Sequence, residues 1–245
     1  MCIIPLEHEL VGKHVSKSNT FFLTVNNNQK KSIQIFTGSP RSWMRKDSCN
    51  DDLCKTKEYV ENNKIHFFIH SLYFINLARN NPKQIENLNW ELSTGLSIGS
   101  KGVVVHVGKH LGNSGSIERM YENIMKLDIS PECPLLLETP AGQGTECLVD
   151  IDEFIEFVKR FDNRLKVCID TCHVWASGYI PIEYIEKFVK EVPNKLVLVH
   201  FNDSKTEKGS RKDRHEFPGK GFIGSEEMNK VFHYCVEKGI PMVIE

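Results

Sequence analysis

Histidine and carboxylate side chains recur where short apolar segments of the chain end. In the stretch VCIDTCH, three apolar residues lead directly to Asp170, and His173 follows three positions later. Five other apolar segments end in the same kinds of side chain, namely His70, His106, Glu138, His200 and Glu245. Imidazole nitrogens and carboxylate oxygens are ligands that Zn²⁺ prefers and that Mn²⁺ also accepts. The pattern therefore predicts a metal site.

A long polar loop adds two more groups of this kind. Residues 203–221 contain Asp213 and His215, which stand two positions apart and so point the same way in an extended backbone. We expect these two to bind one ion together, whereas Asp170 and His173, three positions apart across a strand end, can serve different ions. One catalytic zinc takes three protein ligands and a water, so nine groups are enough for two or three ions.

The chain contains eight short segments rich in β-branched residues, which are typical of strands. Segments with the spacing of helices lie between these strand segments. The predicted strands are 10–16, 32–38, 64–71, 102–108, 134–140, 165–173, 196–203 and 242–245. Helices are expected at about 50–62, in two pieces within 72–98, and at 115–127, 150–161, 181–191 and 224–238. In the 150–161 segment, apolar residues at 151, 154, 155 and 158 share one helix face.

Apolar strands that alternate with helices indicate a parallel sheet covered on both faces. Eight of them predict an α/β fold of the TIM (β/α)₈ barrel type, as a single domain over residues 1–245. A doubly wound open sheet fits the same alternation and differs mainly in strand count. In a barrel, the carboxyl ends of all strands meet on one face, so the nine groups would converge there. The last segment stops at Glu245, so we expect the barrel to lack its final helix.

Composition limits the partners and the compartment. Lys+Arg 31 against Asp+Glu 32 gives no general basic field, so a nucleic acid would have to be met by local patches or bound ions. The chain has no apolar run long enough to cross a bilayer and no secretory signal at its start, so we expect an intracellular protein without a membrane partner. Cytoplasm, nucleus and virion are not distinguished by the sequence.

The eight cysteines form no CxxC pair, which in a reducing compartment indicates thiols rather than a disulfide framework. Cys49 and Cys54 are near enough in the chain to pair, but an intracellular setting disfavours the bond. Cys172 lies between Asp170 and His173, yet harder ligands are already sufficient without it.

Several segments resemble the signatures of the endonuclease IV family of apurinic/apyrimidinic (AP) endonucleases. They are VCIDTCH, HFNDSKTEKGSRKDRH, IHSLYFINLA, LETPAGQGTECL and FTGSPRSW. The similarity runs in register from VGKHVS to Glu245 and so covers nearly the whole chain. Thr139 stands where the family commonly has asparagine.

The resemblance implies a TIM barrel with a trinuclear zinc site. Such an enzyme hydrolyses the DNA phosphodiester 5′ to an abasic site in base-excision repair, leaving a 3′-hydroxyl and a 5′-deoxyribose phosphate. By position, Glu138 would bridge two ions and orient the nucleophile, as the catalytic residue. The implied ligand sets are His70, His106 and Glu138 for the first ion, Glu138, Asp170, His200 and Glu245 for the second, and His173, Asp213 and His215 for the third.

For double-stranded DNA, the resemblance places Arg41 and Tyr73, with Phe74 beside it, on loops that enter the minor groove. Residues alone favour a plainer interpretation, in which Tyr73 and Phe74 are core residues at the start of a helix. Basic residues of the long polar loop are expected to contact phosphates or simply to be solvated; they are Lys205, Lys208, Arg211, Lys212 and Arg214.

Two other hypotheses remain open at this stage. One is a metal-dependent sugar isomerase-like barrel, which would typically hold two ions and act on small polyols. The other is a protein that binds abasic DNA without turnover. For the endonuclease hypothesis we expect a monomer, and 3′-end repair is a compatible second activity.

Overall fold

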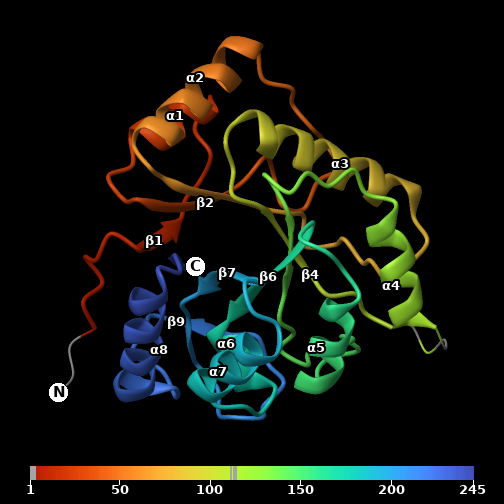
Figure 1. Cartoon of the computed structure of the whole chain (residues 1–245), viewed down its shortest axis with the longest axis vertical. Coiled ribbons are helices and arrows are strands. Elements are labelled where there is room, and N and C mark those ends of the chain that lie inside the picture. Colours follow the sequence, from red (N-terminus) through yellow and green to blue (C-terminus); the bar gives the residue numbers. More distant parts are fainter. Residues whose placement is uncertain (1–3, 111, 113–114) are drawn as a thin grey trace.

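The computed structural model describes residues 4–110, 112 and 115–245, so Cys2 lies outside the described residues. Eight parallel strands close into a barrel in the order β1-β10-β7-β6-β5-β4-β3-β2 (Figure 1). Each predicted strand segment supplies one of them, so the barrel is confirmed and the open sheet is wrong. The strands are β1 (Val11–His14), β2 (Ser32–Phe36), β3 (His66–His70), β4 (Val103–His106), β5 (Leu135–Glu138), β6 (Leu165–Asp170), β7 (Leu196–His200) and β10 (Met242–Ile244).

Helices surround the barrel, and most of them match the predicted segments. They are α1 (Phe21–Asn26), α2 (Asn50–Asn62), α3 (Pro82–Ser97), α4 (Ser116–Met125), α5 (Ile151–Lys159), α6 (Thr171–Ala176), α7 (Pro181–Glu191) and α8 (Gly224–Lys238). The expectation of two pieces within 72–98 is wrong. Asn81 caps a single helix by accepting from the Lys83 N–H, and Pro82 occupies its first position, which a proline tolerates well.

The sequence did not predict α1 and α6, because six residues are too few to show helical periodicity. The predicted strand 165–173 therefore ends early. Asp170 closes β6 and caps α6, its Oδ1 accepting the His173 N–H at 2.9 Å. As a result His173 sits on the first turn of a helix rather than in the strand.

Two apolar layers stabilise the barrel. Alternate strand residues point inward and fill its interior, while the residues between them pack outward against the helices. The interior residues are Phe68, Val104, Leu136, Cys168, Leu198 and Val243. On α5 the predicted apolar face is buried, and each large side chain on it contributes about 1.5–3 kcal/mol by leaving water.

The N-terminal segment packs beside β10 and α8. Leu10 O accepts the Met242 N–H at 2.7 Å, while the His8 ring meets the Phe232 ring of α8 edge-on with centroids 5.7 Å apart. Ile4, Leu6 and Leu10 are partly buried against the main core. These contacts shield apolar residues of β10 and α8 from solvent.

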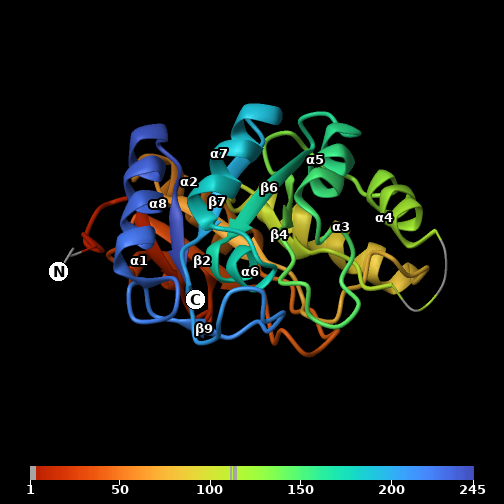
Figure 2. The ribbon, with the colours of Figure 1, turned by 90° about the horizontal axis from the view of Figure 1, so that it is seen from below.

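The loops that follow the strands gather at one end of the barrel, along the lower edge in Figure 2. Among them, β8 (Asp203–Ser204) and β9 (His215–Glu216) form a small antiparallel pair that folds the long polar loop back over the barrel mouth. The buried Asp203 carboxylate accepts the N–H groups of Ser204, Ile223 and Gly224, which fixes both ends of this loop. Among the described residues, every helix is too short or too polar to traverse a lipid bilayer.

Candidate metal centre

All nine predicted groups meet at this end of the barrel. They fall into three sets, and within each set the ligand atoms lie within 4.8 Å of one another. The sets are His70, His106 and Glu138; Glu138, Asp170, His200 and Glu245; and His173, Asp213 and His215. A cavity of about 500 Å³ opens above them and is lined by seven of the nine, while Asp170 and His200 lie fully buried beneath it.

Glu138 belongs to two sets at once. Its Oε2 is 2.9 Å from His106 Nε2 and 3.3 Å from His70 Nε2, and its Oε1 is 2.9 Å from His200 Nδ1. The register of the sheet creates this arrangement, because Glu138 pairs directly with His106 on β4. The carboxylate thus faces one set with each oxygen, as a bridging ligand would.

The second set is completed from neighbouring strands. His200 Nδ1 lies 3.2 Å from Glu245 Oε2 and 3.7 Å from Asp170 Oδ2. Asp170 pairs in register with His200 across β6 and β7, so both side chains lie at the same level along the barrel axis. The Glu245 side chain is only 15% exposed although it is the last residue of the sequence.

The third set joins α6 to the polar loop. Asp213 Oδ2 is 3.3 Å from His173 Nε2, and Asp213 Oδ1 is 3.0 Å from His215 Nε2. Both Nε2 atoms are buried without a hydrogen-bond partner of good geometry. Buried ring nitrogens with no partner are costly, and a bound cation would satisfy both.

Hydrogen bonds fix which nitrogen of each buried histidine faces the centre. His70 Nδ1 is 2.8 Å from the Ser71 carbonyl, and His173 Nδ1 is 2.9 Å from the Thr139 carbonyl. A carbonyl oxygen only accepts, so these nitrogens carry a proton, and the opposite nitrogens face the centre, where a neutral ring presents its lone pair to a bound cation. This pattern is common for histidines that bind metals, and the donor set fits divalent cations.

Charges within the cluster shift the pKa values strongly. Burial alone raises the pKa of Glu138, but His106 and His200 outweigh it and hold the pKa well below its usual range. Burial lowers the pKa of His173 and His200. For His173 the carboxylates of Asp170, Asp213 and Glu138 outweigh burial, and for His200 Cys168, Glu245 and Glu138 do, so both pKa values stay well above the usual value. The pKa of Asp213 is likewise lowered, since His173 and His215 outweigh its burial. Without a cation, protons must balance these carboxylates.

Cys172 lies within reach of Asp170 and His215. Burial raises the pKa of its thiol to about 12, so the sulfur stays protonated near neutral pH and is a poor ligand. Cys49 and Cys54 are free thiols.

The residues predicted to contact DNA are placed differently from one another. Tyr73 lines the cavity and is 49% exposed, and Phe74 beside it is 39% exposed. Neither lies in a helix, so the interpretation of both as core residues at a helix start is wrong. Arg41 is exposed on the loop after β2. Lys205 lines the metal cavity, whereas Arg211 does not; Arg214 takes that place.

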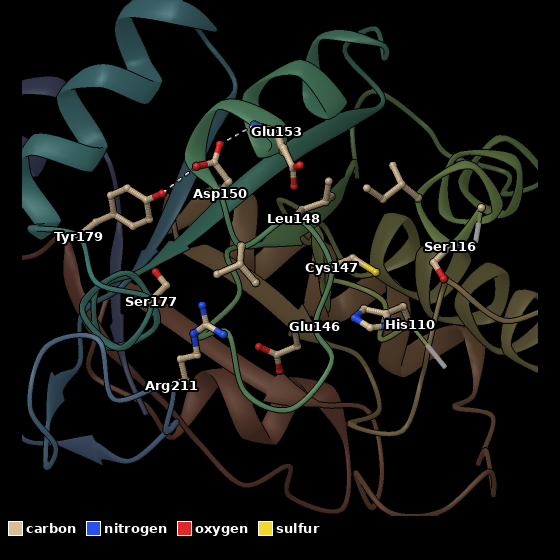
Figure 3. Close-up of a pocket in the computed structure, with 13 residues that line it drawn as sticks. His110, Ser116, Glu146, Cys147, Leu148, Asp150, Glu153, Ser177, Tyr179 and Arg211 are labelled. Carbon is tan, nitrogen blue, oxygen red and sulfur yellow. Dashed lines mark hydrogen bonds between the residues drawn. The ribbon is translucent and has the colours of Figure 1, made fainter. Parts of the chain in front are cut away.

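A second cavity, of about 600 Å³, lies between α4, α5 and the polar loop and receives Arg211 (Figure 3). Two of its acids are already engaged: Asp150 caps α5 and accepts from the Tyr179 hydroxyl, and Glu146 pairs with Lys109. Among the described residues, no set of three metal-ligand side chains lines it. It is therefore separate from the metal centre.

Three polar residues of the centre were not predicted from the sequence. Gln34 and Asn202 hydrogen-bond to members of the second set, and His14 lies 3.7 Å from Glu245 Oε1. His14 is the last residue of β1 and so carried the same strand-end signal as the other histidines.

Comparisons with known proteins agree with this geometry. Residues 30–245 match the family of xylose isomerase-like TIM barrels. The chain is 32% identical to the probable endonuclease 4 of Symbiobacterium thermophilum, over 96% of this chain and 92% of that protein, and 30% identical to that of Bacillus subtilis, over 96% and 86%. The chain belongs to the endonuclease IV family.

Solved structures support the same assignment. Endonuclease IV from Thermus thermophilus matches this member of the family with a TM-score of 0.84 and 27% identity, over 96% of this chain and 91% of that one. A D-tagatose 3-epimerase-like protein matches with a TM-score of 0.68 and 18% identity, over 96% and 89%, which shows a shared barrel fold alone. The resemblance seen in the sequence motifs is therefore confirmed at the level of family.

The pKa shifts predict how the metal-free protein responds to pH. His173 and His200 have folded-state pKa values above the ordinary value of 6.5, so their contribution to stability is complete below pH 6.5 and is lost as the pH rises through the folded values. The free energy of unfolding should fall above pH 6.5 by about 1.4 kcal/mol per pH unit for each of the two histidines. Glu138 and Asp213 do not oppose this, because their lowered pKa values matter only at acid pH.

Urea denaturation in chelator between pH 6.5 and 8.5 measures this slope. The same titration with saturating zinc is the control, and there stability should rise with pH because ligand imidazoles must be neutral. A metal-free protein that gains stability across this range would contradict the charge arrangement described above.

Proposed function

We propose that this protein is a zinc-dependent AP endonuclease of base-excision repair. Its substrate would be double-stranded DNA with an abasic site, cut at the phosphodiester 5′ to the site to leave a 3′-hydroxyl and a 5′-deoxyribose phosphate. The observation that carries the proposal is the set of nine ligand groups joined through Glu138. Likeness to proteins named probable endonuclease 4 supports it.

The three sets would hold three zinc ions, with Mn²⁺ as an acceptable substitute. Bound divalent ions supply stabilisation of negative charge on a phosphate and its leaving oxygen, and they lower the pKa of water. Glu138, in reach of two sets, would orient the attacking water and is the proposed catalytic residue. Lys205 and Arg214 line the same cavity and would hold phosphate oxygens of the bound strand.

Exposed apolar side chains occur on three loops at this end of the barrel, which form its rim, and one of them, Tyr73, lines the cavity. They are Met44 after β2, Tyr73 and Phe74 after β3, and Phe217 and Phe222 after β9, with exposed fractions from 39% to 83%. Exposed apolar groups that cluster on one rim indicate a contact surface, and wedges of this kind unstack DNA steps cheaply where a base is missing. Arg41 and Arg211 are also exposed, and they would add contacts to the groove and backbone of the DNA.

Two of these loops act as one unit. The Trp43 and Phe74 rings meet with centroids 4.5 Å apart, and the Tyr73 N–H donates to the Pro40 carbonyl at 3.3 Å. Arg41 and Tyr73 are therefore held on joined loops, which lowers the cost of ordering them on DNA. The function of a sugar isomerase agrees less well with this site. Such an enzyme typically needs two ions and has no need of a rim of exposed apolar side chains.

Incubation with duplex DNA that carries one synthetic abasic site tests the proposal. Zinc-loaded protein should nick the strand 5′ to the site and leave an end that a polymerase can extend, and chelator should abolish the nick. His173→Ala removes a ligand of the third set and should slow nicking by at least about 100-fold. The control His233→Ala changes an exposed histidine on α8 and should have no effect.

Other outcomes would decide between the remaining hypotheses. Tight binding to abasic DNA without nicking would favour a lesion-binding protein. Turnover of small sugars without nicking would favour an isomerase. Nicking by His173→Ala at the normal rate would refute the three-ion centre.

Tyr73→Ala tests the rim. Loss of an aromatic contact to an unstacked step should weaken binding to abasic duplex by about 1–3 kcal/mol, measured by fluorescence anisotropy, with zinc content unchanged. Met125→Ala is the matched control, because Met125 is 46% exposed but lies on α4, outside the rim. If Tyr73→Ala instead loses zinc, Tyr73 supports the centre by packing rather than contacting DNA.

A further inference from the structure

Glu245 lies just beyond the last residue of β10, so the hydrogen bonds of the sheet do not fix its side chain. Two buried amides provide that support. Gln34 Nε2 donates to Glu245 Oε1 at 2.8 Å, and Asn202 Nδ2 lies 3.4 Å from Oε2. Asn202 also accepts the Glu245 backbone N–H at 3.0 Å. Both oxygens and the backbone of this residue are thus tied to the barrel.

Gln34 also contacts His200. It points inward from the middle of β2 and is fully buried, with its Oε1 2.8 Å from His200 Nε2. Its Nε2 has a second neighbour in His14 Nδ1, at 3.1 Å. The amide therefore lies between one group that accepts, Glu245, and one that can donate, His200.

Glu245 fixes which way this amide points. If the amide were flipped, its oxygen would face a carboxylate oxygen, and two acceptors would repel each other at a fully buried side chain. With the amide held as observed, Oε1 can only accept, so His200 Nε2 must carry the proton. When the ring is neutral, as metal binding requires, its lone pair is on Nδ1, which lies 2.9 Å from Glu138 and 3.2 Å from Glu245.

We propose that Gln34 is a positioning residue for the second ion. Its amide sets the tautomer of His200 through one atom and holds the carboxylate of Glu245 through the other. Asn202 completes the arrangement, because its Nδ2 also donates to Asp170 Oδ2 at 2.8 Å. Two amides thereby orient three of the four ligands of the second set. The inference rests on the proposed function, since it assumes that this set binds metal.

Gln34→Met tests the inference. Methionine has a similar length and volume, so it keeps the packing but removes both hydrogen bonds. We expect one of the three zinc ions to bind about 10–100-fold more weakly, as is typical when a partner of a metal ligand is lost, while the other two keep their affinity. Titration of the purified protein against a chromophoric zinc chelator resolves the three affinities without using nuclease activity.

A second variant changes the contact to Glu245 and keeps the contact to His200. Gln34→Glu keeps an acceptor for His200 Nε2 but places a carboxylate beside Glu245, so it should weaken the same ion as Gln34→Met. Ser32→Ala is the matched control, because Ser32 is a buried residue of the same strand whose hydroxyl donates to Leu10 O at 3.0 Å, away from the centre. It should lower the denaturation midpoint without changing any zinc affinity.

The outcomes distinguish this inference from the proposed function. If wild-type protein binds three zinc ions and Gln34→Met binds them equally well, the inference is wrong and the function stands. If Ser32→Ala weakens zinc as much as Gln34→Met does, Gln34 has only a structural role and the inference is again wrong. If the wild-type protein binds no zinc, both fall together.

Discussion

The burial of the Glu138 carboxylate is the constraint on which the site depends. An isolated charge in a protein interior is too costly to persist, so it must be paired or must bind a cation. Glu138 is 1% exposed and has imidazole nitrogens beside both oxygens. Around it stand three further carboxylates and five histidines in all, and three divalent cations would more than balance four negative charges. Without a cation, protons on the imidazoles balance this charge. A protonated imidazole has no lone pair for a metal, so protons and metal ions compete for the same nitrogens.

The barrel makes such a concentration of charge tolerable. Below the centre, the interior is filled by apolar side chains such as Phe68 and Leu136, so the strands form a stiff support. Parallel register then delivers ligands side by side: Glu138 lies opposite Cys168 on β6 and opposite His106 on β4, and Asp170 lies opposite His200. His70 ends β3, and the other ligands come from α6, the polar loop and the residue after β10.

The ligands at the strand ends could be predicted because each one directly follows a run of apolar residues in the sequence. This pattern is visible without knowledge of the fold. Other parts of the site could not be predicted. Gln34 is a single amide inside SIQIF, and nothing in that segment shows that it meets His200 from across the barrel. Arg211 and Arg214 are equivalent in the sequence, and only the fold of the loop decides that Arg214 faces the centre while Arg211 enters the neighbouring cavity. Six-residue helices such as α6 gave no periodic signal, so the position of His173 on a helix could not be foreseen.

Elemental analysis of the purified protein tests the central claim most directly, because it counts the cations that the cluster around Glu138 requires. After zinc loading and removal of excess metal, we predict three zinc atoms per chain, all released by a strong chelator. One zinc atom or none per correctly folded chain would contradict the account.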